Sequence, residues 1–440
     1  MNPADFVAAL RGCAPYVHAH HGRVFVIAFE GEAAERADFD QLLYDIGLLH
    51  SLGVKLVLVH GARPQINQQL ALRGLTPSYS GGLRITDRAT LDGVKAAVGS
   101  LRMDIEARLS TSLASTPMGG ARIKVASGNW ITARPVGVRD GVDFQFTGEV
   151  RRVDVDTLRQ VLEQGRIALL SAVGYSPTGE IFNLRAKDVA TAAAAALKAD
   201  KLVFVLSSDP NQWQLADDTG DAGQLSLASA EALLAQASHV SEEDRAYLQS
   251  AIDAGRGGVQ RVHLIGASVD GALLRELYTR DGEGLMLYAD ADYEAIRDAS
   301  IEDVGGIVQL IQPLEQRGVL VARSREQLEL DIQHFNVIVR DGLAIACCAL
   351  FPYATDGMGE LACVAVHPDY QRNGHAAALL KRVESEARRL GLKKLFSLTT
   401  HSPHWFIERG FVETGIDALP MQRQQLYNWQ RNSKVLVKQL

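Results

Sequence analysis

Residues 359–400 read GELACVAVHPDYQRNGHAAALLKRVESEARRLGLKKLFSLTT, and this stretch decides the fold of the C-terminal part of the chain. Alternation predicts a strand over 359–366. One face of that strand would carry Glu360, Ala362, Val364 and Val366, and the other Leu361, Cys363 and Ala365. Beyond a proline-containing turn, apolar residues at three- and four-residue spacing predict a helix over 376–390, which Gly391 ends. A second strand follows, and then the aromatic stretch HWFIERGF at 404–411.

The turn that precedes this helix, QRNGHA at 371–376, has the composition of an anion site. Gly374 and Ala376 would leave backbone N–H groups bare at the positive end of the helix, where a pyrophosphate binds well. Alone, such a turn is more typical of an ordinary helix start. The strand before it and the strand and aromatic segment after it make the pattern specific.

This arrangement resembles the Q-x-x-G-x-A signature of the GNAT family of N-acetyltransferases. The resemblance implies acetyl-CoA as co-substrate and a mixed sheet around the cofactor turn. The pattern over 296–440 agrees, with helices expected at 301–316 and 326–332 and a hairpin joined at Asp341–Gly342. The family's cofactor site falls on Cys363, Val364, Val366, Gln371, Arg372, Asn373, Gly374, His375 and Ala376.

Composition excludes several classes of protein. A chain of 440 residues is expected to form two or three domains, and 47% hydrophobic with 22% charged residues is typical of a soluble protein. A net charge of −7 argues against nucleic-acid binding. We find no apolar run of about 18 residues and no secretory signal, so a cytoplasmic protein is expected. The four cysteines have no metal-type spacing, which favours buried thiols and no metal.

The first part of the chain alternates strands and helices. Continuous apolar strands are expected at 24–28, 54–59, 167–171, 202–206 and 262–265, with a helix at 186–199 among the elements between them. Such strands are typical of a parallel sheet buried on both faces, so the sequence predicts a doubly wound α/β domain. The predicted organisation is a helical segment at 1–17, this domain at 18–284, a linker at 285–295 and the acetyltransferase-like domain at 296–440.

The N-terminal domain resembles the amino acid kinase fold, most closely its acetylglutamate kinase branch. The resemblance rests on VFVIAFEGEA (24–33), VKLVLVHGARPQI (54–66), GGLRITD (81–87) and KADKLVFVLSS (198–208). Where the family has its phosphoryl-binding lysine, this chain has Ala28. Where the family has the first glycine of a Gly-Gly pair, this chain has Glu30. A methyl group and a carboxylate there would repel ATP phosphates, so we expect a kinase fold without kinase activity.

A second resemblance within this domain implies regulation. The stretch HLIGASVDGALLRELYTRDGEG at 263–284 is similar to the segment that forms the L-arginine site of arginine-sensitive acetylglutamate kinases. His263, Glu276 and Gly282 fall on matching positions, and Tyr16 lies in the matching N-terminal segment. Glu276 could accept the fork of a guanidinium group. Without the resemblance, a solvated helix glutamate and a core histidine would be the ordinary interpretation.

A kinase-like domain without its lysine, fused to an acetyltransferase, resembles the bacterial N-acetylglutamate synthase family over essentially the whole chain. The resemblance implies acetyl transfer from acetyl-CoA to L-glutamate, the first step of arginine biosynthesis, with feedback inhibition by L-arginine. It also implies a homo-oligomer, often a hexamer. The alternatives are a bifunctional synthase–kinase, which Ala28 opposes, an acetyltransferase for another amine, and an arginine sensor whose acetyltransferase fold is inert.

The same resemblance assigns roles to individual residues. Glu360 matches the proposed general base, although an edge glutamate beside a turn is the plainer interpretation, and a buried base would need a raised pKa. Thr399 and Tyr427 compete as the group that assists departure of the thiolate. Backbone N–H groups near Cys363 and Val364 would polarise the thioester. Cys363 itself is not expected to act as a nucleophile. The acceptor's carboxylates are expected at Arg323, Arg431 and Ser433.

Overall fold

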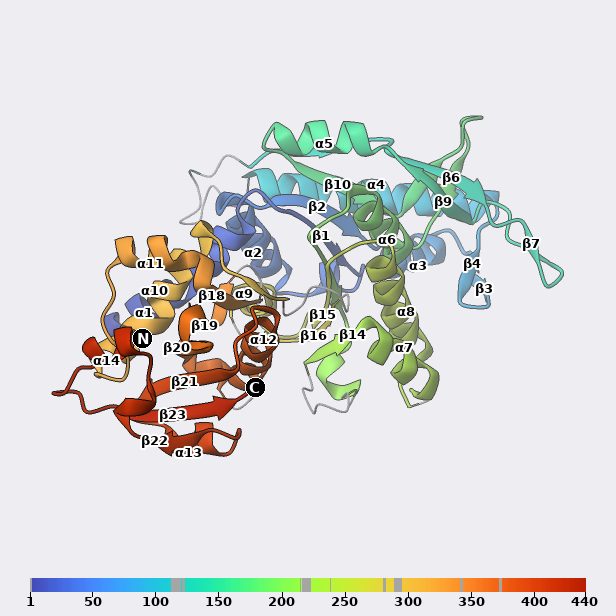
Figure 1. The fold of residues 1–440 in the computed structure, drawn as a ribbon. Helices are drawn as coiled ribbons and strands as arrows, with labels where there is room; N and C mark the ends of the chain where they lie inside the picture. The colour runs from blue at the N-terminus through green and yellow to red at the C-terminus, as the bar shows by residue number, and fades with distance from the viewer. Residues whose placement is uncertain are drawn as a thin grey trace. The chain divides into compact units, whose positions relative to one another are not determined.

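The computed structural model describes residues 2–111, 120, 123–213, 215, 223–237, 239–279, 282–288, 295–340, 343–371 and 374–440. The chain divides into two compact units, Met1–Asp290 and Ala291–Leu440 (Figure 1). The first unit contains the predicted doubly wound domain and the second contains the predicted acetyltransferase-like domain.

The first unit is built on an eight-stranded sheet. In spatial order its strands are β14 (Gln224–Ser226), β16 (Leu285–Tyr288), β15 (Arg261–Gly266), β13 (Lys201–Leu206), β1 (Val24–Phe29), β2 (Lys55–His60), β10 (Ile167–Ser171) and β5 (Val125–Ser127). All neighbouring pairs run parallel except β15 and β16. The central strands are buried almost throughout, as their continuous apolar runs predict.

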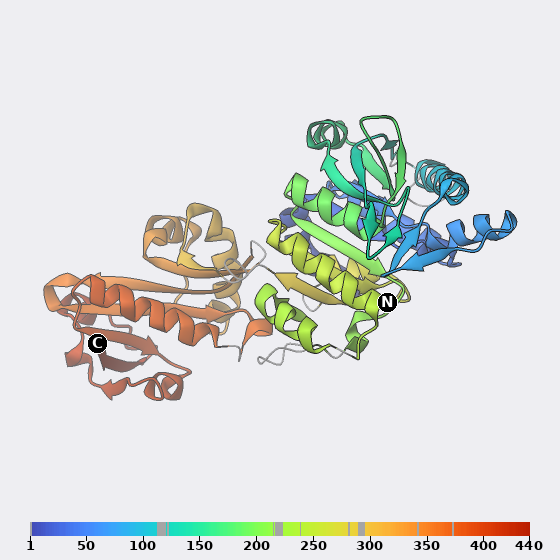
Figure 2. The same ribbon diagram turned by 90° about the vertical axis from the view of Figure 1, so that its right-hand side faces the viewer.

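Helices cover both faces of this sheet (Figure 2). One core contains side chains of α2 (Phe39–Ser51), α4 (Arg88–Thr111) and α9 (Ala272–Tyr278). The other contains side chains of α5 (Val155–Glu163), α6 (Ala186–Leu197) and α8 (Glu242–Arg256). The remaining helices of the unit are α1 (Pro3–His20), α3 (Arg63–Leu72) and α7 (Leu227–Gln236). This is the predicted doubly wound arrangement.

Smaller sheets extend the first unit. A four-stranded sheet has the order β12 (Ile181–Asn183), β11 (Val173–Tyr175), β6 (Ile131–Pro135) and β9 (Gly148–Val153). Two hairpins pair β3 (Ser78–Ser80) with β4 (Leu83–Ile85) and β7 (Val138–Arg139) with β8 (Val142–Asp143). The start of the predicted linker 285–295 is wrong, because residues 285–288 form β16 inside the large sheet. Their apolar side chains pack in that unit's core.

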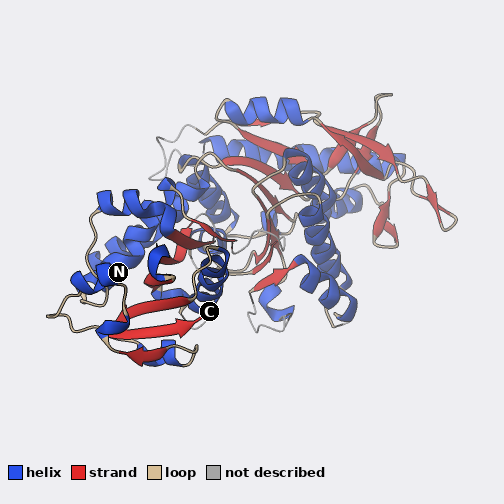
Figure 3. Ribbon diagram, viewed as in Figure 1, coloured by secondary structure: helices blue, strands red, loops and turns tan. Residues whose placement is uncertain are grey.

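The second unit is a seven-stranded mixed sheet (Figure 3). Its order is β17 (Ala295–Asp298), β18 (Phe335–Arg340), β19 (Leu343–Tyr353), β20 (Met358–Val366), β21 (Lys394–Thr399), β23 (Lys434–Gln439) and β22 (Val412–Thr414). Only β20 and β21 run parallel. The helices are α10 (Val304–Gln316), α11 (Arg325–Asp331), α12 (His375–Arg389), α13 (Pro403–Ile407) and α14 (Met421–Gln425). The predicted turn residues Asp341 and Gly342 lie outside the described residues.

The strict alternation predicted for β20 is wrong beyond Ala362. Its register with β19 shifts, since Ala349 faces Ala362 whereas Cys347 faces Ala365, so β20 carries one extra residue. This β-bulge lies at Cys363, whose φ is +51°. In consequence Leu361 packs in the core beneath α12, while Cys363 packs in the other core, with α10 and α11.

Candidate functional site

The site of the second unit opens where β20 and β21 separate. The described pairing of the two strands covers Met358–Glu360. One residue further on, the Ser397 hydroxyl donates a hydrogen bond of 2.9 Å to the Leu361 carbonyl. Beyond this point a cleft of about 870 Å³ opens. It is lined by thirteen of the residues predicted from the sequence: Arg323, Glu360, Cys363, Val364, Val366, Gln371, Gly374, His375, Ala376, Thr399, Tyr427, Arg431 and Ser433. The predicted residues Arg372 and Asn373 lie outside the described residues.

The turn at the start of α12 has the geometry expected of an anion site. Gly374 is the N-cap of the fifteen-residue helix and has a φ of +80°, a conformation that favours glycine. Gln371 holds the turn to the end of β20, because its Nε2 donates to the Val366 carbonyl at 3.3 Å. A Cβ atom at Gly374 would meet nothing within 4 Å, so the backbone is open on the side of the cleft.

The bulge presents backbone, not a reactive thiol, to the cleft. Burial raises the pKa of the Cys363 thiol to about 11, outweighing the positive charge of Arg323, which lowers it. A thiol that holds its proton so firmly is a poor nucleophile at neutral pH. The described pairing between β20 and β21 ends at Glu360, so the bulged segment of β20 has no ladder partner from β21.

Glu360 is held by an arginine that the sequence analysis missed. Arg423, from α14, donates through Nε to Oε2 at 2.8 Å and through Nη2 to Oε1 at 3.1 Å. The Tyr353 hydroxyl lies 3.5 Å from Oε2. Burial lowers the pKa of Arg423, but the hydrogen bonds and charge of Glu360 outweigh it and raise that pKa overall. No periodicity or motif marks Arg423, so only the folded chain shows the pair.

Two further arginines line the cleft without a carboxylate partner among the described residues. Arg323 Nη1 donates to the Val321 carbonyl at 3.4 Å. Arg431 donates to the Val319 carbonyl, and its buried Nε has no partner. Burial and the positive charges of Arg323 and Arg423 lower the pKa of Arg431. This end of the cleft is therefore a cluster of three guanidinium groups with one carboxylate, which favours an anionic ligand.

Tyr427 and Thr399, the two candidates for assisting the leaving group, differ in how their hydroxyl groups are hydrogen-bonded. The Tyr427 hydroxyl donates to the Ser433 carbonyl at 2.6 Å, so its proton is engaged in holding the segment that carries Arg431. Thr399 Oγ1 accepts N–H bonds from His401 at 3.3 Å and Ser402 at 3.2 Å. Its own proton remains available to the cleft, so the geometry favours Thr399.

In the first unit, three of the four residues predicted to bind arginine lie in contact. His263 Nδ1 lies 2.5 Å from Glu276 Oε1, and a Cβ atom at Gly282 would lie 2.8 Å from Oε2. The N–H groups of Glu283 and Gly284 donate to Oε2 at 2.6 and 2.9 Å. Tyr16, from α1, makes a ring contact with His20, which in turn contacts the ring of Tyr278, two residues after Glu276.

The charges of this cluster follow from its burial. Burial alone would raise the pKa of Glu276, but the hydrogen bonds from His263 and from the two backbone N–H groups lower it to about 2. Burial and the charge of Lys201 lower the pKa of His263 to about 4. Lys201 Nζ lies 3.4 Å from His263 Nε2. At neutral pH an anionic Glu276 therefore accepts a bond from a neutral His263, with Lys201 behind it.

The carboxyl ends of β1 and β2, where a kinase of this fold would hold phosphates, carry no lysine from β1. Ala28 is 4% exposed and lies in the core. Glu30 Oε2 accepts bonds from the N–H and the hydroxyl of Ser207 at 2.8 and 2.6 Å, which joins β1 to the end of β13. Glu30 also lines a cavity of about 150 Å³, whose lining includes both acidic and basic side chains: Glu32, Glu243, Arg63, Arg84, Arg185 and Lys187.

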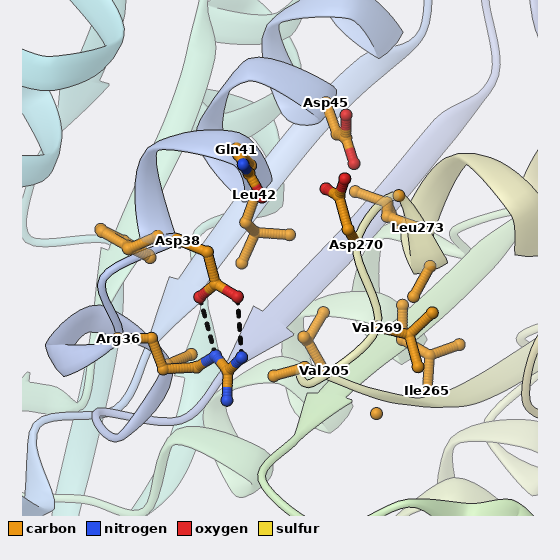
Figure 4. A pocket seen from close by; sticks show the side chains of 16 residues that line it. Arg36, Asp38, Gln41, Leu42, Asp45, Val205, Ile265, Val269, Asp270 and Leu273 are labelled. Carbon is orange, nitrogen blue, oxygen red and sulfur yellow. Dashed lines mark hydrogen bonds and ion pairs between the residues drawn. The ribbon is translucent and has the colours of Figure 1, made fainter.

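A smaller cavity of about 30 Å³ lies between α2 and the segment after β15 (Figure 4). Asp45 and Asp270 face each other there, and burial together with the charge of Asp270 raises the pKa of Asp45 to about 6. The Arg36 guanidinium group donates two hydrogen bonds to the Asp38 carboxylate, at 2.8 and 2.7 Å. This cavity has room for a water molecule but not for an amino acid.

The fold and cleft define the class of protein. A parallel pair of strands that separates at a bulge, beside a glycine-capped helix start, is the site of a GNAT acetyltransferase, and residues 306–411 match the acetyltransferase (GNAT) family. Residues 23–266 match the amino acid kinase family.

Comparisons over the full length narrow this class. The chain is 51% identical to the amino-acid acetyltransferase of Azotobacter vinelandii and 50% identical to that of Pseudomonas putida strain GB-1, each over 99% of this chain and 100% of the relative. The crystal structure of N-acetylglutamate synthase from Neisseria gonorrhoeae, complexed with coenzyme A and L-arginine, is 38% identical, covers 99% of both chains and gives a TM-score of 0.83. A second crystal structure of that enzyme, complexed with coenzyme A and N-acetyl-glutamate, gives a TM-score of 0.60. The chain belongs to the amino-acid acetyltransferase family.

Across the described ranges, no helix is both long enough and apolar enough to span a bilayer. Among the same residues, no group of three or more His, Cys, Asp or Glu side chains could hold a metal ion.

Proposed function

We propose that this acetyltransferase transfers the acetyl group of acetyl-CoA to the α-amine of L-glutamate. The observation that carries the proposal is the cluster of Arg323, Arg423 and Arg431 around Glu360 in one cleft. An acceptor with two carboxylates matches this cluster, and one of the related crystal structures contains N-acetyl-glutamate. An amine acceptor without carboxylates would leave the positive charges uncompensated.

The residues of the cleft support direct transfer. Backbone N–H groups at the start of α12 would hold the pyrophosphate, and those at the Cys363 bulge would polarise the thioester carbonyl. Glu360 takes a proton from the acceptor's ammonium group, and the freed amine attacks the carbonyl carbon. As the C–N bond forms, the nitrogen loses its second proton to water. The C–S bond breaks, and the leaving thiolate takes up a proton from Thr399, which regains one from water, or directly from a water that Thr399 orients.

We further propose that L-arginine inhibits the enzyme through the cluster around Glu276, so that the reaction is the controlled first step of arginine biosynthesis. Its support is the contact of His263, Glu276 and Gly282, together with the relative that was crystallised with L-arginine. A homo-oligomer is proposed as well. Phe6 and Leu10 are 57% and 61% exposed on α1, and a neighbouring copy would cover them.

The test is thiol release from acetyl-CoA with L-glutamate, other amino acids and polyamines as acceptors, each with and without L-arginine. We expect release that depends on glutamate and that arginine suppresses. Release with another acceptor only would overturn the substrate. No release with any acceptor would favour an arginine sensor with an inert acetyltransferase fold. Adding ATP and N-acetylglutamate tests for kinase activity, which Ala28 leads us not to expect.

A further inference from the structure

The pair between Glu360 and Arg423 raises a chemical problem for a general base. Both carboxylate oxygens accept bonds from the guanidinium group, at 2.8 and 3.1 Å, and the two side chains are only 11% and 18% exposed. In this state the carboxylate has its charge compensated and one lone pair on each oxygen engaged by the guanidinium group. Glu360 cannot take a proton efficiently from the acceptor until Arg423 pairs with a different anionic group.

The acceptor itself supplies such an anion at the right place. A proton can pass to Glu360 only if the α-amine lies within hydrogen-bond reach of it. The α-carboxylate of an amino acid is attached to the same carbon as that amine, so it arrives beside Arg423. Arg323 and Arg431 line the same cleft and have no carboxylate partner among the described residues, which leaves them for the side-chain carboxylate.

The segment that carries Arg423 is suited to a small movement. Helix α14 has five residues, and Met421 and Leu426, at its two ends, are 72% and 73% exposed. The remaining nitrogen of Arg423, Nη1, has a long bond of 3.3 Å to the Leu426 carbonyl. Few contacts would therefore be lost if the guanidinium group turned from one carboxylate to another within the cleft.

We infer that Arg423 is the resting partner of Glu360 and that it passes to the α-carboxylate of the incoming acceptor, which frees Glu360 to act as the base. Arg423 is thus both an acceptor-binding and a positioning residue. The exchange makes the base available only when an α-amino acid occupies the cleft. This inference rests on the proposed function, because it assumes glutamate as the acceptor.

The exchange predicts that weakening the resting pair strengthens acceptor binding. In Glu360→Gln the bidentate ion pair is replaced by a hydrogen bond from Arg423 to one neutral amide oxygen, so less must be broken when glutamate binds. Titration calorimetry of the full chain saturated with coenzyme A, which prevents turnover, measures this directly. We expect the Kd for L-glutamate to fall at least about threefold. In Arg423→Gln it rises at least about tenfold.

Two analogues of glutamate test whether Arg423 binds the α-carboxylate of the acceptor. L-Glutamine keeps the α-carboxylate and should also bind more tightly to Glu360→Gln than to the wild type. 4-Aminobutyrate lacks that group, so its affinity should not change. An equal gain for 4-aminobutyrate, or a Kd for glutamate that is unchanged or higher in Glu360→Gln, would overturn the exchange while leaving glutamate as the substrate. Wild-type protein that binds coenzyme A but not glutamate would overturn the proposed function and the exchange with it. Unchanged coenzyme A affinity in each variant shows that the cleft is folded.

Discussion

At the residue scale, the site depends on how a few charges are distributed in a half-buried cleft. Glu360, Arg323, Arg423 and Arg431 line one cleft, and among the described residues only Arg423 forms an ion pair with Glu360. Arg323 and Arg431 each donate to backbone carbonyls, which leaves their charges uncancelled. The cleft therefore carries net positive charge before any ligand arrives, and Glu360 is the group that we propose as the proton acceptor there.

The first prediction concerns Glu360. Replacement by glutamine keeps the shape of the side chain but removes its ability to accept a proton, so acetylation of glutamate should slow by about two orders of magnitude or more. Steady-state thiol release measures the rate, and coenzyme A titration should show unchanged affinity. The matched control is Glu408→Gln, an exposed glutamate whose side chain has a described ion pair with its neighbour Arg409 alone. Turnover close to that of the control would remove Glu360 from the role of base.

The limits of sequence analysis are clearest for single residues. Ala28 could be found because a motif fixes the position at which a lysine is missing. Arg423 could not, because it lies 63 residues from Glu360 on a short helix without a recognisable pattern. Ion pairs that cross between elements depend on the folded chain alone. Thirteen of the fifteen proposed acetyltransferase-site residues were nevertheless found to line one cleft, since the turn and strand motifs lie beside it.

At the element scale, β20 shows why a simple period fails at a functional site. The sequence 359–366 alternates well enough to predict a strand, and the strand is present. The bulge at Cys363 then shifts the alternation by one residue. No pattern in the side chains of this segment predicts the bulge, because a bulge is a local change of backbone pairing. The helix that follows was predicted to within one residue at each end, because its apolar stripe packs against the sheet.

The second prediction concerns the start of α12. In Gly374→Ala the added methyl group enters open space on the cleft side, where a pyrophosphate would approach the backbone, and the positive φ of +80° adds strain of about 1–2 kcal/mol. Binding of coenzyme A should weaken at least tenfold, a change of about 1.4 kcal/mol. Calorimetry measures the affinity and urea unfolding the stability.

The other end of the same helix supplies the matched control. Gly391 has a φ of +75° and likewise no atom within 4 Å of an added Cβ. Gly391→Ala should therefore cost a similar free energy of unfolding without affecting coenzyme A. If both variants lose affinity equally, strain in the helix explains the result, and the N-terminal turn is not the pyrophosphate site.

At the scale of the whole molecule, the chain joins an enzyme to a domain that keeps a kinase fold without its lysine. The two units have separate cores, and the division falls after β16. The linker was predicted too early because the sequence LMLY at 285–288 reads as a strand without showing which sheet it joins. The antiparallel pairing of β16 with β15 shows that residues 285–288 belong to the sheet of the first unit. Strand β16 begins directly after residues 283 and 284, whose N–H groups donate to Glu276.

The last prediction follows from that loop. Glu276 accepts bonds from His263 and from the N–H groups of residues 283 and 284, which immediately precede β16. If arginine acts here, its guanidinium group must compete for this carboxylate, and the loop before β16 responds. Glu276→Ala should abolish inhibition by arginine while glutamate-dependent thiol release persists. The first unit should lose about 1–3 kcal/mol of stability for each buried donor left unpaired.

Two comparisons separate inhibitor binding from general damage to the first unit. Glu106→Ala removes another glutamate of that unit, one whose carboxylate accepts a bond from Ser127 at 2.6 Å, and it should leave inhibition intact. Glu276→Gln keeps the side chain's size and most of the stability, yet it lacks the charge that a guanidinium group requires, so it too should resist arginine. Arginine sensitivity that survives in Glu276→Gln would place the inhibitor elsewhere in the chain. Loss of sensitivity in Glu106→Ala would show that inhibition fails whenever the first unit is weakened.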